Sequence, residues 1–348
     1  MMDRPPDSEA KLAPGRLLLL LGLMVVLSGC RGLVAGSSTQ DASLQSINHI
    51  IFMAQENRGF DHYFGAVRQY WAANGIADQS FDGLPQFNPT SGLAPLRGAA
   101  PTNPGCDPRY VPPNDCTIGG QSPKVGSFPM VSMCVETPSP SWNESHVDWS
   151  LGNPVAASPS LNGFVWTAAH DARANQPQFS DVNGVRAMGY YDENDLPYYY
   201  FMASKFATSD RWFSPVMSRT QPNRLFMLAA TSAGHVYPLP AGGAPLANLT
   251  IFDALQKAGV SWKVYVTDLT HATPPINDST LNMFASASKY PTNIVPVSQY
   301  SSDLAGGSLP SVSFIDPGYS SGLDEHPGLD DGAPGGSVQL GSQYVASL

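Results

Sequence analysis

The chain has 348 residues, 42% of them hydrophobic, and a formal net charge of −10 at pH 7. With 18 lysines and arginines against 28 acidic residues, it lacks the clustered cations that bind phosphate backbones, which argues against nucleic acid as a partner. Its 32 glycines and 32 prolines, with only 13% charged residues, are typical of a turn-rich globular chain rather than a disordered one.

The N-terminal segment predicts export. Residues 17–27 form an apolar run that is too short to span a bilayer but suits the core of a signal peptide. The run ends in Leu27-Ser28-Gly29-Cys30, which resembles the bacterial lipobox, where the cysteine sulfur receives a lipid. We expect residues 1–30 to be a lipoprotein signal peptide with a membrane anchor at Cys30, and residues 31–46 to be a linker. The alternative is a plain secretory signal, which gives a periplasmic or secreted protein.

The first predicted strand covers residues 50–54. This apolar run does not alternate with polar residues, which is typical of a strand covered on both faces of a sheet. Glu56 and Asn57 follow where the strand ends, the position at which open α/β sheets place ligands. Their adjacent oxygen atoms suit a hard divalent cation. The alternative is an ordinary loop with solvated polar side chains.

Residues 66–145 are rich in proline, glycine, asparagine and serine, and predict a long irregular excursion from the core. Three cysteines fall within it, and an exported chain meets an oxidising compartment. Cys106 and Cys116 bracket a short turn-rich loop. The spacing favours one disulfide between them and leaves Cys134 over.

Later segments alternate helix and strand. Residues 195–206 predict a helix with Asp195 as an acidic N-cap and a proline in the first turn. Residues 250–259 have a hydroxyl cap, apolar residues spaced by three to four, and a final glycine, and the strand-like residues 260–266 follow. This order is typical of an α/β sheet. Apolar spacing in residues 338–348 predicts a further helix.

A second polar cluster precedes an apolar helical run, in the sequence SRTQPNR over residues 218–224. The proline two residues after Thr220 places this hydroxyl at a helix N-terminus, where unpaired N–H groups and the helix dipole favour an anion. Thr220 is therefore a candidate nucleophile toward phosphorus, and Asn223 and Arg224 can hold phosphate oxygens. The alternative is that Thr220 or Ser218 only caps the helix.

Three separated motifs together resemble a known family. They are HIIFMAQENRGFDHYFG from His49, DLPYYYFMASKFATSDRWFSPVMSRTQPNRLFMLAATSAG from Asp195, and LPSVSFIDP from Leu309 with the later EHP. In this order they are similar to the bacterial phosphoesterases that include the non-specific phospholipases C and a group of acid phosphatases, within the alkaline-phosphatase-like superfamily. The resemblance implies that residues 47–348 form an α/β domain, a three-layer α/β/α sandwich of the alkaline phosphatase type with a long loop-rich insertion.

The resemblance also implies the site. Glu56 and Asn57 would bind one divalent metal ion of unknown identity, and Thr220 would contact the metal and act as the nucleophile that forms a covalent phospho-enzyme. Asn223 would orient a phosphate oxygen. His326, in the EHP motif, would donate a hydrogen bond near the phosphate or support the groups around it.

Two parts of the chain depart from the family pattern. His146 matches a histidine that relatives carry before a tryptophan, which implies a catalytic role, but Pro140 stands where many relatives have another histidine, so the hydrogen bond of that second histidine does not carry over from the family. In the family, a later strand ends in a DExGG segment that brings the remaining carboxylate ligands. Residues 324–328, DEHPG, follow LPSVSFIDP and so match the EHP motif instead. We therefore expect a truncated enzyme, incomplete at its C-terminal end and lacking a metal-ligand cluster and a strand.

The activity implied for the complete enzyme is metal-dependent hydrolysis of a phosphoester, with a phospholipid or a small phosphoester as substrate, and a truncated fragment need not retain it. Phospholipase C cleavage of phosphodiesters is favoured, because aromatic residues can line a choline pocket, although they can equally pack in the core. One alternative is an acid phosphatase that acts on monoesters, and another is a surface lipoprotein that binds ligand without catalysis. The aromatic candidates are Trp142, Trp149, Tyr190, Tyr191, Tyr198, Tyr199 and Tyr200.

Overall fold

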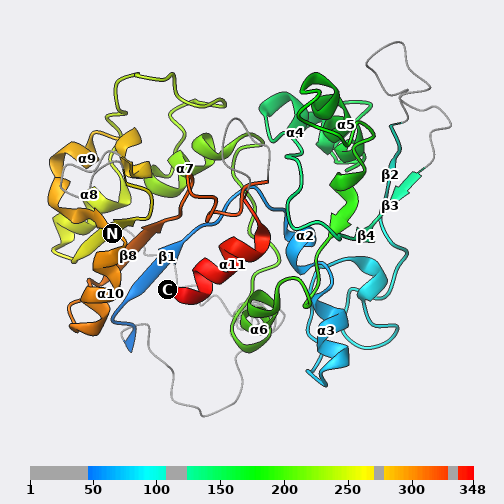
Figure 1. Cartoon of the computed structure of the whole chain (residues 1–348), viewed down its shortest axis with the longest axis horizontal. Coiled ribbons are helices and arrows are strands. Elements are labelled where there is room, and N and C mark those ends of the chain that lie inside the picture. The colour runs from blue at the N-terminus through cyan, green and yellow to red at the C-terminus, as the bar shows by residue number, and fades with distance from the viewer. Residues whose placement is uncertain (1–45, 107–123, 270–277, 328–335) are drawn as a thin grey trace, which may run out of the picture. The chain divides into compact units, whose positions relative to one another are not determined.

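A parallel sheet organises the chain from His49 onward (Figure 1). Its strands are β1 (Ile50–Met53), β6 (Trp262–Val266), β7 (Ile294–Pro296) and β8 (Val312–Asp316), in the order β1-β8-β6-β7. All three neighbouring pairs are parallel. In the register, Met53 lies beside Ile315, and Val266 beside Asp316. The carboxyl ends of β1 and β8 therefore meet at the same edge of the sheet.

The computed structural model describes residues 46–106, 124–269, 278–327 and 336–348. Within them, two small sheets pair β2 (Thr102–Pro104) with β3 (Lys124–Gly126), and β4 (Phe128–Pro129) with β5 (Gly189–Tyr190).

The predicted α/β class is confirmed, whereas the three-layer sandwich and the truncation stay predictions. The helices and 3-10 turns are α2 (Phe60–Phe64), α3 (Val67–Ala73), η2 (Pro85–Phe87), α4 (Trp142–Trp149), α5 (Phe164–Ala174), η4 (Val185–Met188), α6 (Pro197–Lys205), α7 (Thr220–Ala229), α8 (Ile251–Ala258), η5 (Thr280–Met283), α9 (Ser286–Lys289), η6 (Pro291–Asn293), α10 (Ser298–Ala305) and α11 (Val338–Ser347).

β1 begins with two exposed side chains, which corrects the prediction that residues 50–54 are covered on both faces of the sheet. Among the described residues it pairs only with β8, and the side chains of Ile50 and Ile51 are exposed. Its later residues are half-buried, and the ring of Phe52 stacks on Phe314 of β8 at a centroid distance of 5.3 Å. An unbroken apolar run predicts a strand, but it does not distinguish the edge of a sheet from its centre.

The helix and strand predicted over residues 250–266 are confirmed. α8 begins after Thr250, whose hydroxyl accepts the Asp253 N–H while the Asp253 carboxylate accepts the Thr250 N–H, a complete capping box. The helix ends at Gly259, which has a left-handed backbone with φ of 70°. Phe252 then packs on Trp262 at the start of β6, with ring centroids 4.6 Å apart, in the main apolar core.

Other helices differ from the predictions by small amounts. α6 begins at Pro197 with Leu196 as its N-cap, so the predicted cap at Asp195 is wrong by one residue. α7 begins at Thr220, as predicted, and Arg219 occupies the N-cap position. α11 confirms the predicted C-terminal helix. α3 interrupts the region predicted to be irregular, because Val67 and Trp71 are buried in a second apolar core.

The cysteine prediction is confirmed in part. Cys106 is disulfide-bonded, and its partner lies outside the described residues, as does Cys116. Cys134 is free and exposed, as expected for the cysteine left over. The signal peptide and Cys30 also lie outside the described residues. Within the described ranges, the structure contains no helix with the length and apolar character needed to cross a membrane.

Candidate active site

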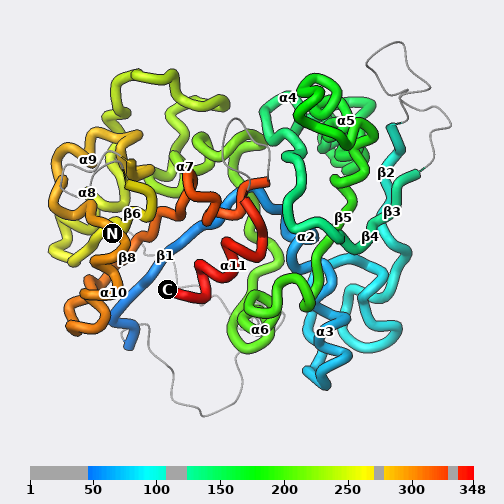
Figure 2. Tube along the Cα trace, viewed as in Figure 1, coloured from blue at the N-terminus to red at the C-terminus, as the bar shows by residue number. Residues whose placement is uncertain are grey.

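Two loops run side by side at the carboxyl edge of the sheet, one after β1 and one after β8 (Figure 2). The Glu56 N–H donates to the Asp324 carbonyl at 2.9 Å. The Gln55 side-chain amide donates to the Leu323 carbonyl at 2.8 Å, and the Arg58 Nε to the Glu325 carbonyl at 2.7 Å. These three bonds hold residues 55–58 against residues 323–325, although more than 260 positions separate them in the sequence.

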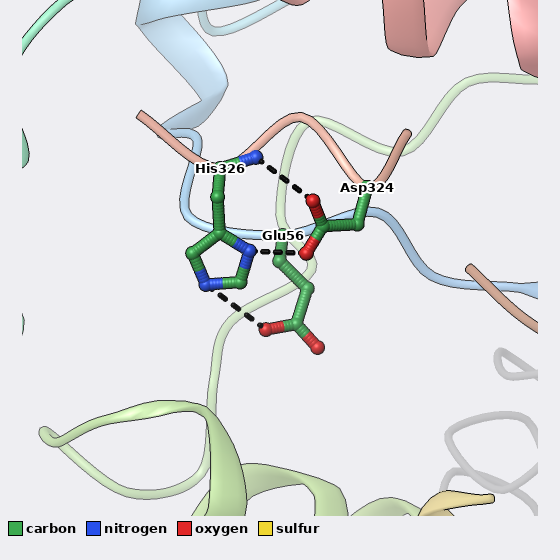
Figure 3. A group of neighbouring side chains, drawn as sticks. All are labelled: Glu56, Asp324 and His326. Atoms are coloured by element: carbon green, nitrogen blue, oxygen red, sulfur yellow. Dashed lines mark hydrogen bonds and ion pairs between the residues drawn. The ribbon is translucent and has the colours of Figure 1, made fainter. Parts of the chain in front are cut away.

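Glu56, Asp324 and His326 gather where the two loops meet (Figure 3). Each offers a potential ligand atom, and these atoms lie within 4.8 Å of one another. Both carboxylates are buried, Asp324 completely. His326 Nδ1 bonds to Asp324 Oδ2 and therefore donates, since a carboxylate can only accept. The other ring nitrogen, Nε2, lies 3.6 Å from Glu56 Oε2.

Glu56 also pairs with Arg224 on α7. Its Oε1 atom accepts from Arg224 Nε at 2.9 Å and from Nη2, and the Ala54 carbonyl accepts from Nη2 at 2.7 Å. Both side chains are almost completely buried, with 6% of Arg224 and 4% of Glu56 exposed. Arg224, predicted to hold a phosphate oxygen, is thus engaged with a carboxylate of the protein.

Thr220 and Asn57 meet at the same end of the sheet. The Thr220 hydroxyl donates to Asn57 Oδ1 over 3.4 Å, a long hydrogen bond. Thr220 is the first residue of α7, so its hydroxyl lies at the helix N-terminus. Asn57 has a left-handed backbone with φ of 58°. The structure therefore brings the proposed nucleophile to the loop that carries Glu56 and Asn57, and their metal-binding roles stay predictions.

Asn223 shapes the loop before α7. Its side-chain amide donates to the carbonyls of Val216, Ser218 and Arg219 at 3.0 to 3.1 Å, and its oxygen accepts the Val216 N–H at 3.0 Å. The side chain therefore fixes the turn that presents Thr220. The predicted contact of Asn223 with a phosphate oxygen stays a prediction.

His146 lies on α4. Its Nδ1 bonds to the Trp142 carbonyl at 2.7 Å, and the two rings pack with centroids 4.1 Å apart. These contacts are within the helix, and the predicted catalytic role of His146 stays a prediction. Among the aromatic candidates for a choline pocket, Tyr191 and Tyr200 are fully buried in the second apolar core. Packing in this core accounts for Tyr191 and Tyr200 without a role in a choline pocket.

Three buried carboxylates near the site were not predicted as functional: Asp324, Glu325 and Asp316. Glu325 has a left-handed backbone with φ of 72° and accepts the hydroxyls of Tyr63 at 2.8 Å and Tyr199 at 2.5 Å. Burial raises the pKa of Glu325, and these hydroxyl bonds counteract that rise. The adjacent letters DEH in the third motif were the available signal for Asp324.

Asp316 ends β8 and is completely buried. It accepts the Ser279 hydroxyl at 2.8 Å and both the N–H and the hydroxyl of Thr280, at 3.0 and 2.6 Å. Burial raises the pKa of Asp316, and the hydroxyl bonds oppose that rise. The carboxylate thus holds η5 against the end of the sheet.

Comparison with known protein families identifies the family of this chain. A model of the Phosphoesterase family matches residues 47–345. The chain belongs to the phosphoesterase family. This confirms the resemblance found in the three sequence motifs.

This phosphoesterase is 29% identical over 321 residues to Phospholipase C B of Mycobacterium tuberculosis, covering 84% of the chain and 53% of that protein. It is 29% identical over 293 residues to Non-specific phospholipase C6 of Arabidopsis thaliana, covering 82% and 47%. With Hemolytic phospholipase C of Pseudomonas aeruginosa it shares 25% identity over 249 residues, covering 68% and 28%. The chain spans about half the length of the first two relatives.

Proposed function

We propose that this phosphoesterase hydrolyses phosphodiesters in the manner of a phospholipase C, with a divalent metal ion and with Thr220 as the nucleophile. One observation carries the proposal. Thr220, at the start of α7, meets Asn57, while the neighbouring Glu56 meets Asp324 and His326. The names of the relatives favour a phospholipid diester as substrate.

The side chains at this edge fit a divalent cation. Two buried carboxylates and an imidazole converge within 4.8 Å, and the amide oxygen of Asn57 belongs to the next residue after Glu56. Carboxylate and amide oxygens suit hard cations. Glu56, Asn57 and Asp324 would hold the ion, and His326 would lie beside it as a proton carrier. Once bound, it would polarise a phosphoryl oxygen and lower the pKa of the attacking hydroxyl.

In the proposed reaction, neutral His326 takes the proton of the Thr220 hydroxyl as Thr220 Oγ1 attacks phosphorus. A bond from threonine oxygen to phosphorus forms, and the bond from phosphorus to the glycerol oxygen breaks. The backbone N–H groups at the start of α7 bind the phosphoryl oxygens. Asp324 holds His326 with Nε2 directed toward Glu56, and protonated His326 gives its proton to the leaving alkoxide. Water then attacks the phosphothreonine and gives a proton to His326, which passes it to the departing Thr220 oxygen. The phosphorylated headgroup leaves, and the Thr220 hydroxyl is restored.

Turnover of paired chromogenic substrates tests the proposal. The purified chain should hydrolyse p-nitrophenyl phosphorylcholine faster than p-nitrophenyl phosphate, lose activity in EDTA, and regain it when a divalent metal is added. Faster hydrolysis of the monoester would replace the diesterase with an acid phosphatase. Metal-dependent stabilisation without turnover of either substrate would support a binding lipoprotein instead.

We also propose that the chain is exported and anchored through a lipid on Cys30. An acyl chain contributes roughly 0.8 kcal/mol per buried CH₂ group, so a lipidated chain should fractionate with membranes. Cys30→Ala should release the protein or block its processing, as measured by fractionation and metabolic labelling with palmitate. A wild-type chain found entirely in the soluble periplasm or the medium would contradict lipidation and leave export intact.

A further inference from the structure

Arg224 joins the two elements that supply the proposed nucleophile and metal ligand. It lies four residues after Thr220 on α7, so the two side chains project from the same face of the helix. From there it reaches Glu56 and the Ala54 carbonyl, beyond the end of β1. One buried side chain thus ties the first turn of α7 to the loop after β1.

The same contact gives the two oxygens of Glu56 different environments. Oε1 is held by two nitrogens of Arg224. Oε2 points to the side of His326 and lies 3.6 Å from its Nε2 (Figure 3). A planar guanidinium can hold one carboxylate oxygen through two N–H groups at once, which a lysine ammonium cannot reproduce.

α7 is therefore fixed to the β1 loop at two points one turn apart. The first is the contact of Thr220 with Asn57, and the second is the contact of Arg224 with Glu56. The guanidinium is backed by the ring of Tyr319, with Cζ 5.9 Å from the ring centroid. A rotation of α7 about its axis would break both contacts, so Arg224 controls the direction in which the Thr220 hydroxyl points.

We propose that Arg224 is a positioning residue for the reaction. It leaves only Oε2 of Glu56 available to a metal ion, offsets the charge of that carboxylate, and aligns Thr220 with the site. This inference rests on the proposed function, because it needs Glu56 as a ligand and Thr220 as a nucleophile.

Two substitutions and a matched control test the inference. Arg224→Lys keeps the charge but loses the pair of N–H groups that bind Glu56 Oε1 together. Arg224→Met keeps the approximate length and loses the charge. Arg186→Lys is the control, because Arg186 is equally buried, with 7% exposed, and binds the carbonyls of Thr137 and Ala168 away from the site. Each variant is compared with the wild type by its melting temperature, its kcat and KM on p-nitrophenyl phosphorylcholine, and calorimetric titration with Mn²⁺.

Arg224→Lys should lower kcat about 100-fold, the size of effect expected from a misplaced reacting group, with KM nearly unchanged. Arg224→Met should lower kcat at least as much and yet bind Mn²⁺ about tenfold more tightly, because it frees Oε1 and removes a neighbouring positive charge. A general loss of structure would weaken metal binding. Arg186→Lys should lower the melting temperature without changing kcat or the Mn²⁺ affinity.

The outcomes separate this inference from the proposed function. Wild-type kcat in Arg224→Lys, or equal losses of kcat in Arg224→Lys and Arg186→Lys, would overturn the positioning role alone. If Arg224→Met does not fold, Arg224→Lys still decides between these outcomes. A wild-type chain that neither binds Mn²⁺ nor hydrolyses the diester would overturn the proposed function, and the role of Arg224 with it.

Discussion

Two buried arginines of this molecule, Arg186 and Arg224, both lie among carboxylates but in different kinds of cluster. Arg186 binds four backbone carbonyls, those of Glu136, Thr137, Ala168 and Asp181, and also the Asp181 carboxylate. Two acids beside it accept hydrogen bonds as well: Glu136 accepts the Ser180 hydroxyl at 2.8 Å, and Asp181 accepts the Arg186 N–H at 2.9 Å. Each nitrogen of this guanidinium therefore has an acceptor, and we call this arrangement the Arg186 clamp.

The cluster around Arg224 is open. Among the described residues its Nη1 has no hydrogen-bond partner, and one oxygen of Glu56 faces an imidazole at 3.6 Å rather than a close donor. Asp324 and His326 direct further polar atoms to the same place. Buried polar atoms in native proteins are normally hydrogen-bonded, so buried polar atoms without partners need an explanation, such as a bound ion. The contrast makes the Glu56 cluster the better candidate for a metal site.

The largest expected effect concerns Thr220. If it is the nucleophile, Thr220→Ala should lower turnover by at least about three orders of magnitude, while the melting temperature should change little because Arg219 and not Thr220 occupies the N-cap position. Thr220→Ser should retain measurable activity. Acid quenching followed by mass spectrometry should find phosphate on residue 220 in the wild type and the serine variant. Normal turnover by Thr220→Ala would shift suspicion to Ser218.

The second effect concerns Glu56, whose buried pairing with Arg224 makes the residue important for stability as well as for metal binding. Glu56→Ala should abolish metal binding and, by leaving Arg224 buried without its partner, should also lower the free energy of unfolding by about 3–5 kcal/mol. Urea denaturation and metal titration would measure the two losses. Glu56→Gln is the control that keeps the shape and loses the charge. Full stability and full metal content in Glu56→Ala would contradict the assignment of the Glu56 cluster as a metal site that differs from the Arg186 cluster.

The smallest expected effect concerns Asp148, which lies beside the Arg186 clamp. This residue of α4 accepts the Thr167 hydroxyl of α5 at 2.6 Å, next to the Ala168 carbonyl that binds Arg186. Burial raises the pKa of Asp148 from 3.8 to about 7, and Glu144 adds to the rise while the Thr167 bond opposes it. Between these pKa values the folded state binds more protons than the unfolded state, so the free energy of unfolding falls as the pH rises from about 4 to about 7.

Asp148→Asn removes this titration and keeps an oxygen for the Thr167 hydroxyl. Its stability should therefore change less over that pH window, and at pH 8 it should exceed that of the wild type. Thermal melts at pH 4, 6 and 8 would show the difference. Identical pH profiles for the two proteins would mean that Asp148 titrates normally in the folded state.

Features that depend on neighbours in the chain could be predicted from the sequence. The cap at Thr250, the glycine stop at Gly259 and the helix start at Thr220 each involve only a few adjacent residues. Features that depend on distant partners could not. The pairing of Glu56 with Arg224 spans 168 positions, and that of Tyr63 with Glu325 spans 262. No periodicity in the sequence carries such information.

The site was therefore predicted only in part. The motifs identified Glu56, Asn57 and Thr220, which the structure brings to one end of the sheet. They did not show that Asp324 would join Glu56, because that contact forms when the loops after β1 and β8 pair. Nor did the apolar letters of residues 50–54 show that β1 has β8 as its single neighbour among the described strands, since strand neighbours are a property of the whole sheet.

The left-handed backbone at Asn57 restricts how this corner of the molecule can be altered. Asparagine and aspartate adopt that conformation far more readily than β-branched or bulky residues. An engineer who wants a different ion preference has few substitutions to try there. Asn57→Asp keeps the backbone and adds a negative charge, whereas valine or isoleucine would force the chain out of its turn. The left-handed main chain thus restricts which side chains, and so which metal ligands, can occupy position 57.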